Sequence, residues 1–302
     1  MAISRAQLVK ELEPGLNALF GLEYKRYDSE HEEIYAKESS DRAFEEEAML
    51  SGFANAQTKP EGQGVSFDEA QETFTARYTH ETVALAFAIT EEAMEDNLYD
   101  RISSRYTKAL ARSMANAKQV KAASPLNNGL PSGTFNTGDG TTLISASHPT
   151  IAGTFSNTLA TAADLNETSL EQAMIDIAAF TDERGLKIAA KGMKMIIPSA
   201  LQFTADRLMK SPGRVGTADN DINALKNMGM IPQGYRVNHY LTDTDAFYII
   251  TDVPNGMKYF DRAPLKTAME GDFDTGNVRY KARERYSFGC SDPRGIYGSP
   301  GA

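Results

Sequence analysis

The side chains that most often perform catalysis or bind metal are few and scattered in this chain. Its four histidines, at 31, 80, 148 and 239, have no second histidine or carboxylate at a recognisable metal-ligand spacing. Its one cysteine, Cys290, has no adjacent histidine to generate a thiolate and cannot form an internal disulfide. We expect His148, in a loop, and His239, in a strand, to be ordinary hydrogen-bonding residues, and Cys290 to be a buried or half-buried structural residue.

Short motifs approach ligand-binding patterns without completing them. The cluster at 219–223 begins like a calcium loop, but Ala224 stands where that loop needs glycine and Met230 where a bidentate glutamate should close it. Gly62 and Gly64 lack the third glycine of a dinucleotide-binding turn, and neither a Gly-Lys-Ser/Thr phosphate loop nor a Gly-x-Ser-x-Gly elbow occurs. The sequence therefore predicts no catalytic residue, no cofactor and no metal, in a protein that is not an enzyme.

Net charge and hydropathy argue against two classes of binding partner, nucleic acids and membranes. The 302 residues include 41 acidic and 31 basic side chains, a formal net charge of −10. Because nucleic-acid affinity comes from clustered lysine and arginine, this balance disfavours a dedicated nucleic-acid binder. No stretch approaches the roughly 20 apolar residues that cross a bilayer, and the N-terminus lacks the apolar run of a secretion signal, so a soluble protein without a membrane partner is expected.

The N-terminal third begins with dense charge and continues with strand patterns. The first fifty residues hold twelve acidic and six basic side chains, with runs at 30–33 and 45–47. Such runs are typical of a solvated helix face or of an arm that orders against a neighbouring subunit. The polar stretch 55–64 predicts a projecting loop tip, and the alternating residues at 73–78 and 83–89 predict two strands after it.

A long amphipathic helix is predicted for residues 91–123. Thr90 can cap its first turn, and no glycine or proline interrupts the chain before Pro125. A helix of this length would be a rod of roughly 50 Å at about 1.5 Å per residue, so we expect a spine with different packing partners along its length. Apolar residues recur at every fourth position: Met94, Leu98, Ile102, Tyr106, Leu110 and Met114.

The residues from 124 to 164 are rich in glycine, serine, threonine and asparagine, which predicts a long irregular loop that is functional or contacts another subunit. Order resumes at Thr168, where the sequence Thr-Ser-Leu-Glu has the form of a capping box for a helix ending near Gly185. We expect Leu170, Met174, Ile177 and Ala178 on its buried face.

The region from 187 to 253 predicts a compact α/β unit. A strand at 193–197 runs into Pro198 and a helix that ends at 211–213. A short helix at 222–228 is expected to be capped by the acidic cluster 219–221 and closed by Gly229. Two further strands, at 235–240 and 246–251, flank a turn at 242–245, and the chain turns again at 254–256.

A last strand is predicted at 278–286, with one apolar face and one basic face. The basic residues are Arg279, Lys281, Arg283 and Arg285. They could touch nucleic acid, but the interleaved Glu284 and the acidic chain favour salt bridges with a neighbour.

The order of these parts resembles the Hong Kong-type phage capsid fold, from about residue 43 to the C-terminus. Several stretches are similar to the Mu-like major head subunit branch of that family. They are Ser-His-Pro at 147–149, Ser-Asn-Thr-Leu at 156–159, Leu-Glu-Gln-Ala at 170–173, Ile-Pro-Ser-Ala-Leu at 197–201 and Gly-Thr-Ala-Asp-Asn-Asp-Ile-Asn at 216–223. None is a catalytic signature.

The resemblance implies an α+β fold with five parts. These are an N-terminal arm (1–43), an extended β-hairpin loop (44–82), a peripheral domain with the spine helix and glycine-rich loop (83–186), an axial α/β domain (187–255) and return strands of the peripheral domain (256–302). It also implies a major capsid protein that forms hexamers and pentamers in an icosahedral shell around double-stranded DNA, with the loop lying over a neighbouring copy.

The implied partners are further copies of the chain, a portal protein, packaged DNA by proximity without sequence-specific binding, and, left open, a decoration protein. Because only about ninety residues precede the spine helix, we expect scaffolding to come from a separate protein. The expected location is the virion, with assembly in the host bacterial cytoplasm. The alternatives are another virion component, such as a tail tube, or an enzyme with an unrecognised site.

Overall fold

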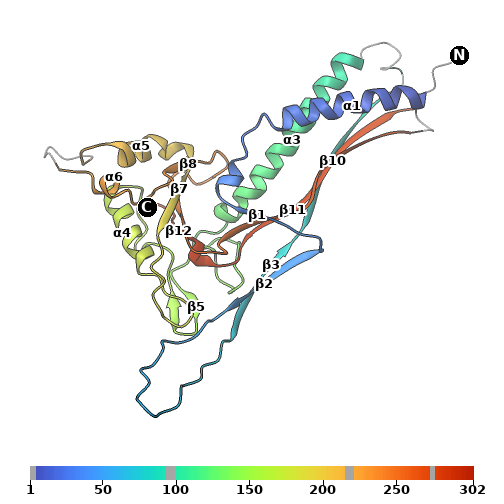
Figure 1. Cartoon of the computed structure of the whole chain (residues 1–302). Helices are drawn as coiled ribbons and strands as arrows, with labels where there is room; N and C mark the ends of the chain where they lie inside the picture. The colour runs from blue at the N-terminus through green and yellow to red at the C-terminus, as the bar shows by residue number, and fades with distance from the viewer. Residues whose placement is uncertain (1–4, 91, 93–98, 215–220, 273–275) are drawn as a thin grey trace.

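The computed structural model describes residues 5–90, 92, 99–214, 221–272 and 276–302. The chain forms two lobes and a projecting hairpin (Figure 1). One lobe contains a four-stranded sheet with two long helices, and the other contains a second four-stranded sheet with shorter helices. Among the described residues, no helix is both long and apolar enough to cross a bilayer.

The first sheet has the strand order β1-β10-β11-β4 and combines the two ends of the chain. β1 (Ala36–Ser39) runs parallel to β10 (Met257–Gly271), whereas β11 (Val278–Cys290) is antiparallel to both β10 and β4 (Glu81–Ile89). The strand predicted at 278–286 is confirmed. Its even-numbered residues from 278 to 286 are buried, and its odd-numbered residues are exposed or half-buried.

Two helices cover the buried face of this sheet. α1 (Arg5–Tyr24) lies across α3 (Tyr99–Asn127), and both contact the sheet. Leu16 and Phe20 of α1 meet Leu110 and Met114 of α3 above Tyr280. Burying such side chains stabilises the fold by about 1.5–3 kcal/mol each. Much of the charged N-terminal segment is thus a helix packed on its own chain.

The spine helix is confirmed, but its predicted end at residue 123 is wrong. α3 continues through Pro125 to Asn127, although proline lacks the N–H that would bond to the carbonyl of residue 121. Tertiary contacts hold this last turn. The Tyr35 hydroxyl donates to the Ala122 carbonyl at 2.6 Å, and the Tyr248 hydroxyl donates to the Leu126 carbonyl at 3.0 Å.

The predicted apolar stripe of the spine is correct only in part. Leu110 and Met114 are buried, but Tyr106 is 53% exposed and Thr107 is buried in its place. A true helix repeats every 3.6 residues, so the buried side drifts away from a strict four-residue pattern. Residues 91 and 93–98 lie outside the described residues. The predicted start at residue 91, the cap by Thr90 and the positions of Met94 and Leu98 therefore stay predictions.

The second sheet has the order β12-β9-β7-β8. Its centre is β7 (Gly192–Ile197), which pairs parallel with β8 (Tyr235–Val237) and antiparallel with β9 (Phe247–Thr251). β8 and β9 are therefore not direct partners across the turn at 242–245. β12 (Ile296–Ser299) pairs with β9, so the last strand of the chain lies in this sheet, not in the first.

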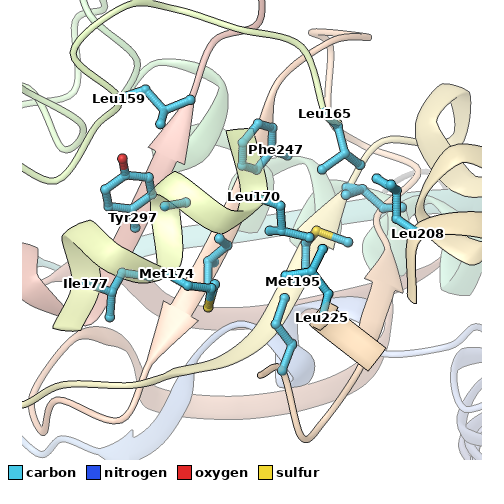
Figure 2. Close-up of a cluster of buried hydrophobic side chains, with 14 of the residues drawn as sticks. Leu159, Leu165, Leu170, Met174, Ile177, Met195, Leu208, Leu225, Phe247 and Tyr297 are labelled. Carbon is cyan, nitrogen blue, oxygen red and sulfur yellow. The ribbon is translucent and has the colours of Figure 1, made fainter. Parts of the chain in front are cut away.

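The core of the second lobe lies between this sheet and its helices (Figure 2). α4 (Glu167–Ala178) contributes Leu170, Met174 and Ile177, which lie near Met195 of β7. Three of the four residues predicted for the buried face of this helix are confirmed. The fourth, Ala178, is exposed.

Both predicted ends of α4 are wrong. The cap is Asn166, whose side chain accepts from the Ser169 N–H at 2.8 Å while the Ser169 hydroxyl accepts from the Asn166 N–H at 3.0 Å. Thr168 is therefore inside the helix. At the other end, Gly185 serves a tight turn at φ +83°, well after the helix has stopped.

The remaining helices of this lobe follow the predicted order. After Pro198 come a short 3₁₀ turn (Ser199–Leu201) and α5 (Gln202–Lys210). α6 (Ala224–Met228) is capped by Asn223 and not by the acidic cluster, of which residues 219 and 220 lie outside the described residues. Gly229 closes it at φ +61°, as predicted.

The glycine-rich segment 124–164 is more ordered than predicted. It contains a small hairpin of β5 (His148–Thr150) and β6 (Gly153–Phe155). Asn157 is fully buried and donates to the carbonyls of Leu143, Pro293 and Ile296 at 2.8–3.2 Å. These bonds tie the segment to the C-terminal strands of the same chain.

Candidate assembly surfaces

A projecting hairpin is formed by β2 (Phe44–Leu50) and β3 (Glu72–Thr79) and carries the loop 51–71, in which residues 52–71 are exposed. Local pattern predicted β3. The acidic run at 45–47 gave no strand pattern for β2, so a strand here was implied only by the resemblance, through its β-hairpin loop at 44–82. In a strand that run alternates, so Glu45 and Glu47 are half-buried and Glu46 is exposed. The charge run is therefore a strand and not a helix face.

The base of the hairpin is fixed to the first lobe by buried polar groups. Tyr78 packs on Phe260 with ring centroids 4.7 Å apart, and its hydroxyl shares a 2.5 Å hydrogen bond with Ser291. Lys258 donates to Glu47 at 2.6 Å. Burial alone would lower the pKa of Lys258, but the carboxylates of Glu47 and Glu38 raise it. The hairpin thus leaves the lobe in a defined direction.

The far part of the hairpin carries apolar side chains that the chain does not cover. Leu50, Phe53 and Val65 are 61–62% exposed, and Phe67 is 93% exposed. Single exposed apolar residues are common, but four on one projecting hairpin are typical of a surface that another molecule covers. The loop is therefore a candidate contact with a partner.

The outer face of the first sheet is basic. Arg279 pairs with Asp272 at 2.6 Å, and Arg285 donates to the Ala43 carbonyl at 3.4 Å. Lys266, Lys281 and Arg283 are exposed and have no carboxylate partner among the described residues. The predicted division of β11 into an apolar and a basic face is confirmed, but Glu284 lies on the buried face.

Beneath α1 the buried face of the sheet contains a charged group. The Lys118 ammonium of α3 lies 3.3 Å from the Glu284 carboxylate, which is 2% exposed, and the Tyr24 hydroxyl also donates to Glu284 at 3.4 Å. Burial raises the pKa of Glu284 above its ordinary value, although Lys118 lowers it. Glu284 therefore bonds within its own chain, whereas the sequence suggested a neighbouring subunit.

The turn after α1 joins the two lobes. Its 3₁₀ segment (Glu30–Glu33) places Glu33 2.6 Å from Lys194 and 3.4 Å from Arg236, both in the second sheet. Glu30 accepts from the backbone and the ring of His239 at 2.9 and 2.7 Å. The same segment faces α3 through His31, so one short turn contacts the spine and the second lobe.

A buried ion cluster lies at a second junction. Arg294, in the 3₁₀ turn Pro293–Gly295, donates to Glu183 at 2.7 Å and to the Thr181 carbonyl at 2.7 Å, and lies 3.3 Å from Asp292. All three ionic side chains are at most 7% exposed. The Arg294 guanidinium also lies over the Phe155 ring at 5.0 Å. These contacts join the C-terminal chain to the loop after α4.

The histidines have separate structural partners. His31 and His80 are buried beside Gln119 and Ser287 respectively, and His239 is exposed beside Glu30, two residues after β8 ends. His148 is almost fully buried and lies 2.6 Å from Asp139. Hydrogen bonds from His148 and Thr137 lower the pKa of Asp139 although burial opposes this.

Other residues considered for chemistry also have structural surroundings. Cys290 is buried, as predicted, and burial raises the pKa of its thiol. Gly62 and Gly64 lie in the extended loop, outside any strand-to-helix turn. Within the described ranges, no group of three or more His, Cys, Asp or Glu residues could hold a metal ion.

The second lobe also exposes apolar residues near its helices. Phe203 of α5 is 72% exposed, while Ile222, two residues before α6, and Met228, the last residue of α6, are each 69% exposed. Sequence patterns did not single out these residues, or the loop residues Phe53 and Phe67, as contacts. An apolar residue within a polar loop was the one sequence signal for such a contact. Whether the rest of the chain covers that residue is seen only in the structure.

Comparison with known proteins shows which family and which solved structures this chain is similar to. The family model described as phage capsid protein matches residues 72–299. The capsid of Myoviridae phage XM1 is similar at 11% identity and a TM-score of 0.56, with 89% of each chain covered. The capsid of an empty GTA particle is similar at 15% identity and a TM-score of 0.58, with 90% of each covered. No curated protein matches the sequence.

A virus-like particle from Pyrococcus furiosus is similar at 10% identity and a TM-score of 0.54, covering 95% of this chain and 98% of the other. At such identities these likenesses show the fold, and the predicted α+β phage capsid fold is confirmed. The Mu-like branch is not distinguished by any of the matches. The family model covers well over half of the sequence. The chain therefore belongs to the phage capsid protein family and is a structural protein of the capsid, not an enzyme.

Proposed function

We propose that copies of this chain associate through hexamers and pentamers into an icosahedral shell that encloses double-stranded DNA. The observation that supports this most directly is the projecting loop, where Phe53 and Phe67 remain exposed on the isolated subunit. Apolar area removed from water drives association at about 25 cal/mol per Å². A loop that another copy covers would bury these rings at each contact, and many such contacts add up in a closed shell.

The charges of the subunit favour the same arrangement. The chain has a net charge of −10, yet the outer face of its first sheet presents Lys266, Lys281 and Arg283, which pair with no carboxylate in the described part of the chain. The loop 51–71 carries three carboxylates and one lysine. Complementary charge on neighbouring copies would orient their approach and disfavour other packings.

Replacing Phe53 and Phe67 together by serine is expected to leave the subunit folded and to impair assembly. Each ring buried at a contact contributes about 1.5–3 kcal/mol, so the concentration needed for assembly should rise roughly 100-fold or more. Electron microscopy of the expressed protein measures the yield of shells, and circular dichroism measures the fold. The matched control replaces Gln57 and Gln63 of the same loop by serine.

An unchanged yield of shells from the variant with serine at positions 53 and 67 would contradict the proposed role of the loop. Rods in the wild-type micrographs would support the tail-tube alternative, and a stable isolated subunit would contradict self-assembly altogether.

We also propose a separate scaffolding protein and a portal protein as partners, assembly in the host cytoplasm, and contact with DNA by proximity alone. Co-expression with a scaffold candidate, scored by closed shells of uniform size, tests the first of these.

A further inference from the structure

The edge strands of this chain differ in how they are protected from pairing with another strand. An edge strand presents unpaired backbone N–H and C=O groups, and proteins usually shield it by keeping it short or charged. β1 and β12 have four residues and β8 has three. β2 carries three consecutive glutamates, and β3 carries Arg77.

β4 has neither form of protection. It is nine residues long and forms the edge of the first sheet, and after Glu81 it contains no charge and no proline. Its backbone pairs with β11 on one side, and no described residue outside β11 bonds to its backbone. Leu85, at its centre, is 46% exposed.

The sequence of β4 is complementary to itself. Val83, Leu85 and Phe87 point to one face, and Ala84 and Ala86 point to the other. If two copies of β4 run antiparallel about a two-fold axis at Leu85, Leu85 faces Leu85 of the second copy and Val83 faces Phe87. Aromatic and β-branched side chains are favourable cross-strand partners, and Glu81 would face Ile89 and not another carboxylate.

We propose that the free edge of β4 pairs with β4 of a second copy, so that two four-stranded sheets become one continuous sheet across a two-fold axis. This inference names one contact within the self-assembly proposed above and rests on it. The pairing satisfies the free backbone groups of the edge and buries Leu85. Such an isologous contact needs only one surface that matches itself.

The same pairing accommodates the basic face. The rows of cations on β11 and its copy are separated by two β4 strands, three strand spacings of about 4.8 Å apart, or roughly 14 Å. This exceeds the Debye length of about 8 Å at physiological salt, so their repulsion is largely screened. Between the rows lies a floor of small residues from both copies: Thr82, Ala84, Ala86 and Ala88.

Cysteine cross-linking tests the pairing in the full-length chain. Leu85→Cys is expected to give most of the subunit as a covalent dimer with a short bismaleimide, because its two copies face each other. In the matched control Ala88→Cys, residue 88 faces residue 82 of the second copy, and the two cysteines are about 20 Å apart along the strands. This variant should stay monomeric on a denaturing gel, and a mixture of Ala88→Cys with Thr82→Cys should cross-link.

Charge exchange provides an independent readout. Leu85→Lys places two ammonium groups opposite each other at the axis, so shell yield should fall about tenfold or more, as like charges directly opposite destabilise a strand pair. Leu85→Glu should behave alike, and co-expression of the two variants should restore shells. Circular dichroism checks that each subunit folds.

Absence of the Leu85→Cys dimer, in shells and in free subunits alike, would overturn the edge pairing. Failure of the wild-type chain to form shells would overturn the proposed function instead. A Leu85→Cys dimer without shells would support the pairing while refuting the closed particle.

Discussion

Replacing Arg294 by alanine is expected to lower the free energy of unfolding by about 3–5 kcal/mol, because removing one partner leaves buried charges uncompensated. Arg294 lies between Glu183 and Asp292, and all three ionic side chains are at most 7% exposed. Burial already raises the pKa of Asp292 above its ordinary value although Arg294 lowers it. Urea denaturation at neutral pH, followed by circular dichroism, measures the loss.

The exposed pair between Arg279 and Asp272 is the matched control. Arg279 is 62% exposed, so Arg279→Ala should change stability by less than about 1 kcal/mol. Arg294→Lys retains the charge but loses the planar fork, and it should fall between the two. A loss below about 1 kcal/mol for Arg294→Ala would show that water replaces the guanidinium at this junction.

The fold should lose about 2 kcal/mol through His31 alone as the pH falls from 7 to 5, and about 3 kcal/mol by pH 4. His31 is 5% exposed, its ring packs edge-on against Tyr259, and burial together with the nearby Lys118 lowers its pKa to about 4. The unfolded chain takes up this proton near pH 6.5, but the folded chain resists it until about pH 4. The stabilisation is therefore complete above pH 6.5 and is lost as the pH falls through this window.

His31→Phe isolates this contribution, since it keeps an aromatic ring and removes the titrating nitrogen. Between pH 7 and pH 4 the wild type should lose about 3 kcal/mol more of its unfolding free energy than His31→Phe loses. Burial also lowers the pKa of His80, and the pKa of Glu284 is raised, but both groups are present in both proteins and cancel in the comparison. Gln63→Ser, at an exposed loop position with no titrating group, should follow the wild-type curve. Parallel curves for wild type and His31→Phe would refute the assignment.

Local pattern was sufficient to predict much of this fold. The spine helix, the strand at 193–197 and the alternation from 278 to 286 depend on periodicity within a few turns or residues, and all three are confirmed. Helix ends were less predictable. The spine passes Pro125 because Tyr35 and Tyr248, distant in sequence, bond to carbonyls of its last turn.

The contacts that define the surfaces and junctions of this chain join residues distant in the sequence, so local sequence patterns could not predict them. Local pattern did not predict β2, because three consecutive glutamates resemble a solvated run. The resemblance implied a hairpin at 44–82, and pairing with β3 identifies the glutamates as part of a strand. Glu284 was expected to form a salt bridge with a neighbouring subunit, because its actual partner, Lys118, is 166 residues away in the sequence. The buried roles of Asn157 and Arg294 likewise depend on carbonyls and carboxylates from distant segments.

The strand orders of the two sheets limit how early the protein can fold during its synthesis. β10 and β11 lie between β1 and β4, although both are translated about 170 residues or more after β4, and β12 joins β9 from the far end of the sequence. Neither sheet can be completed until β10, β11 and β12, which span residues 257–299, have left the ribosome, so β4 has no β11 to pair with on the nascent chain before then. Subunits that are competent to join a partner therefore arise only after β12 has been translated, which separates the folding of each copy from its encounter with the next.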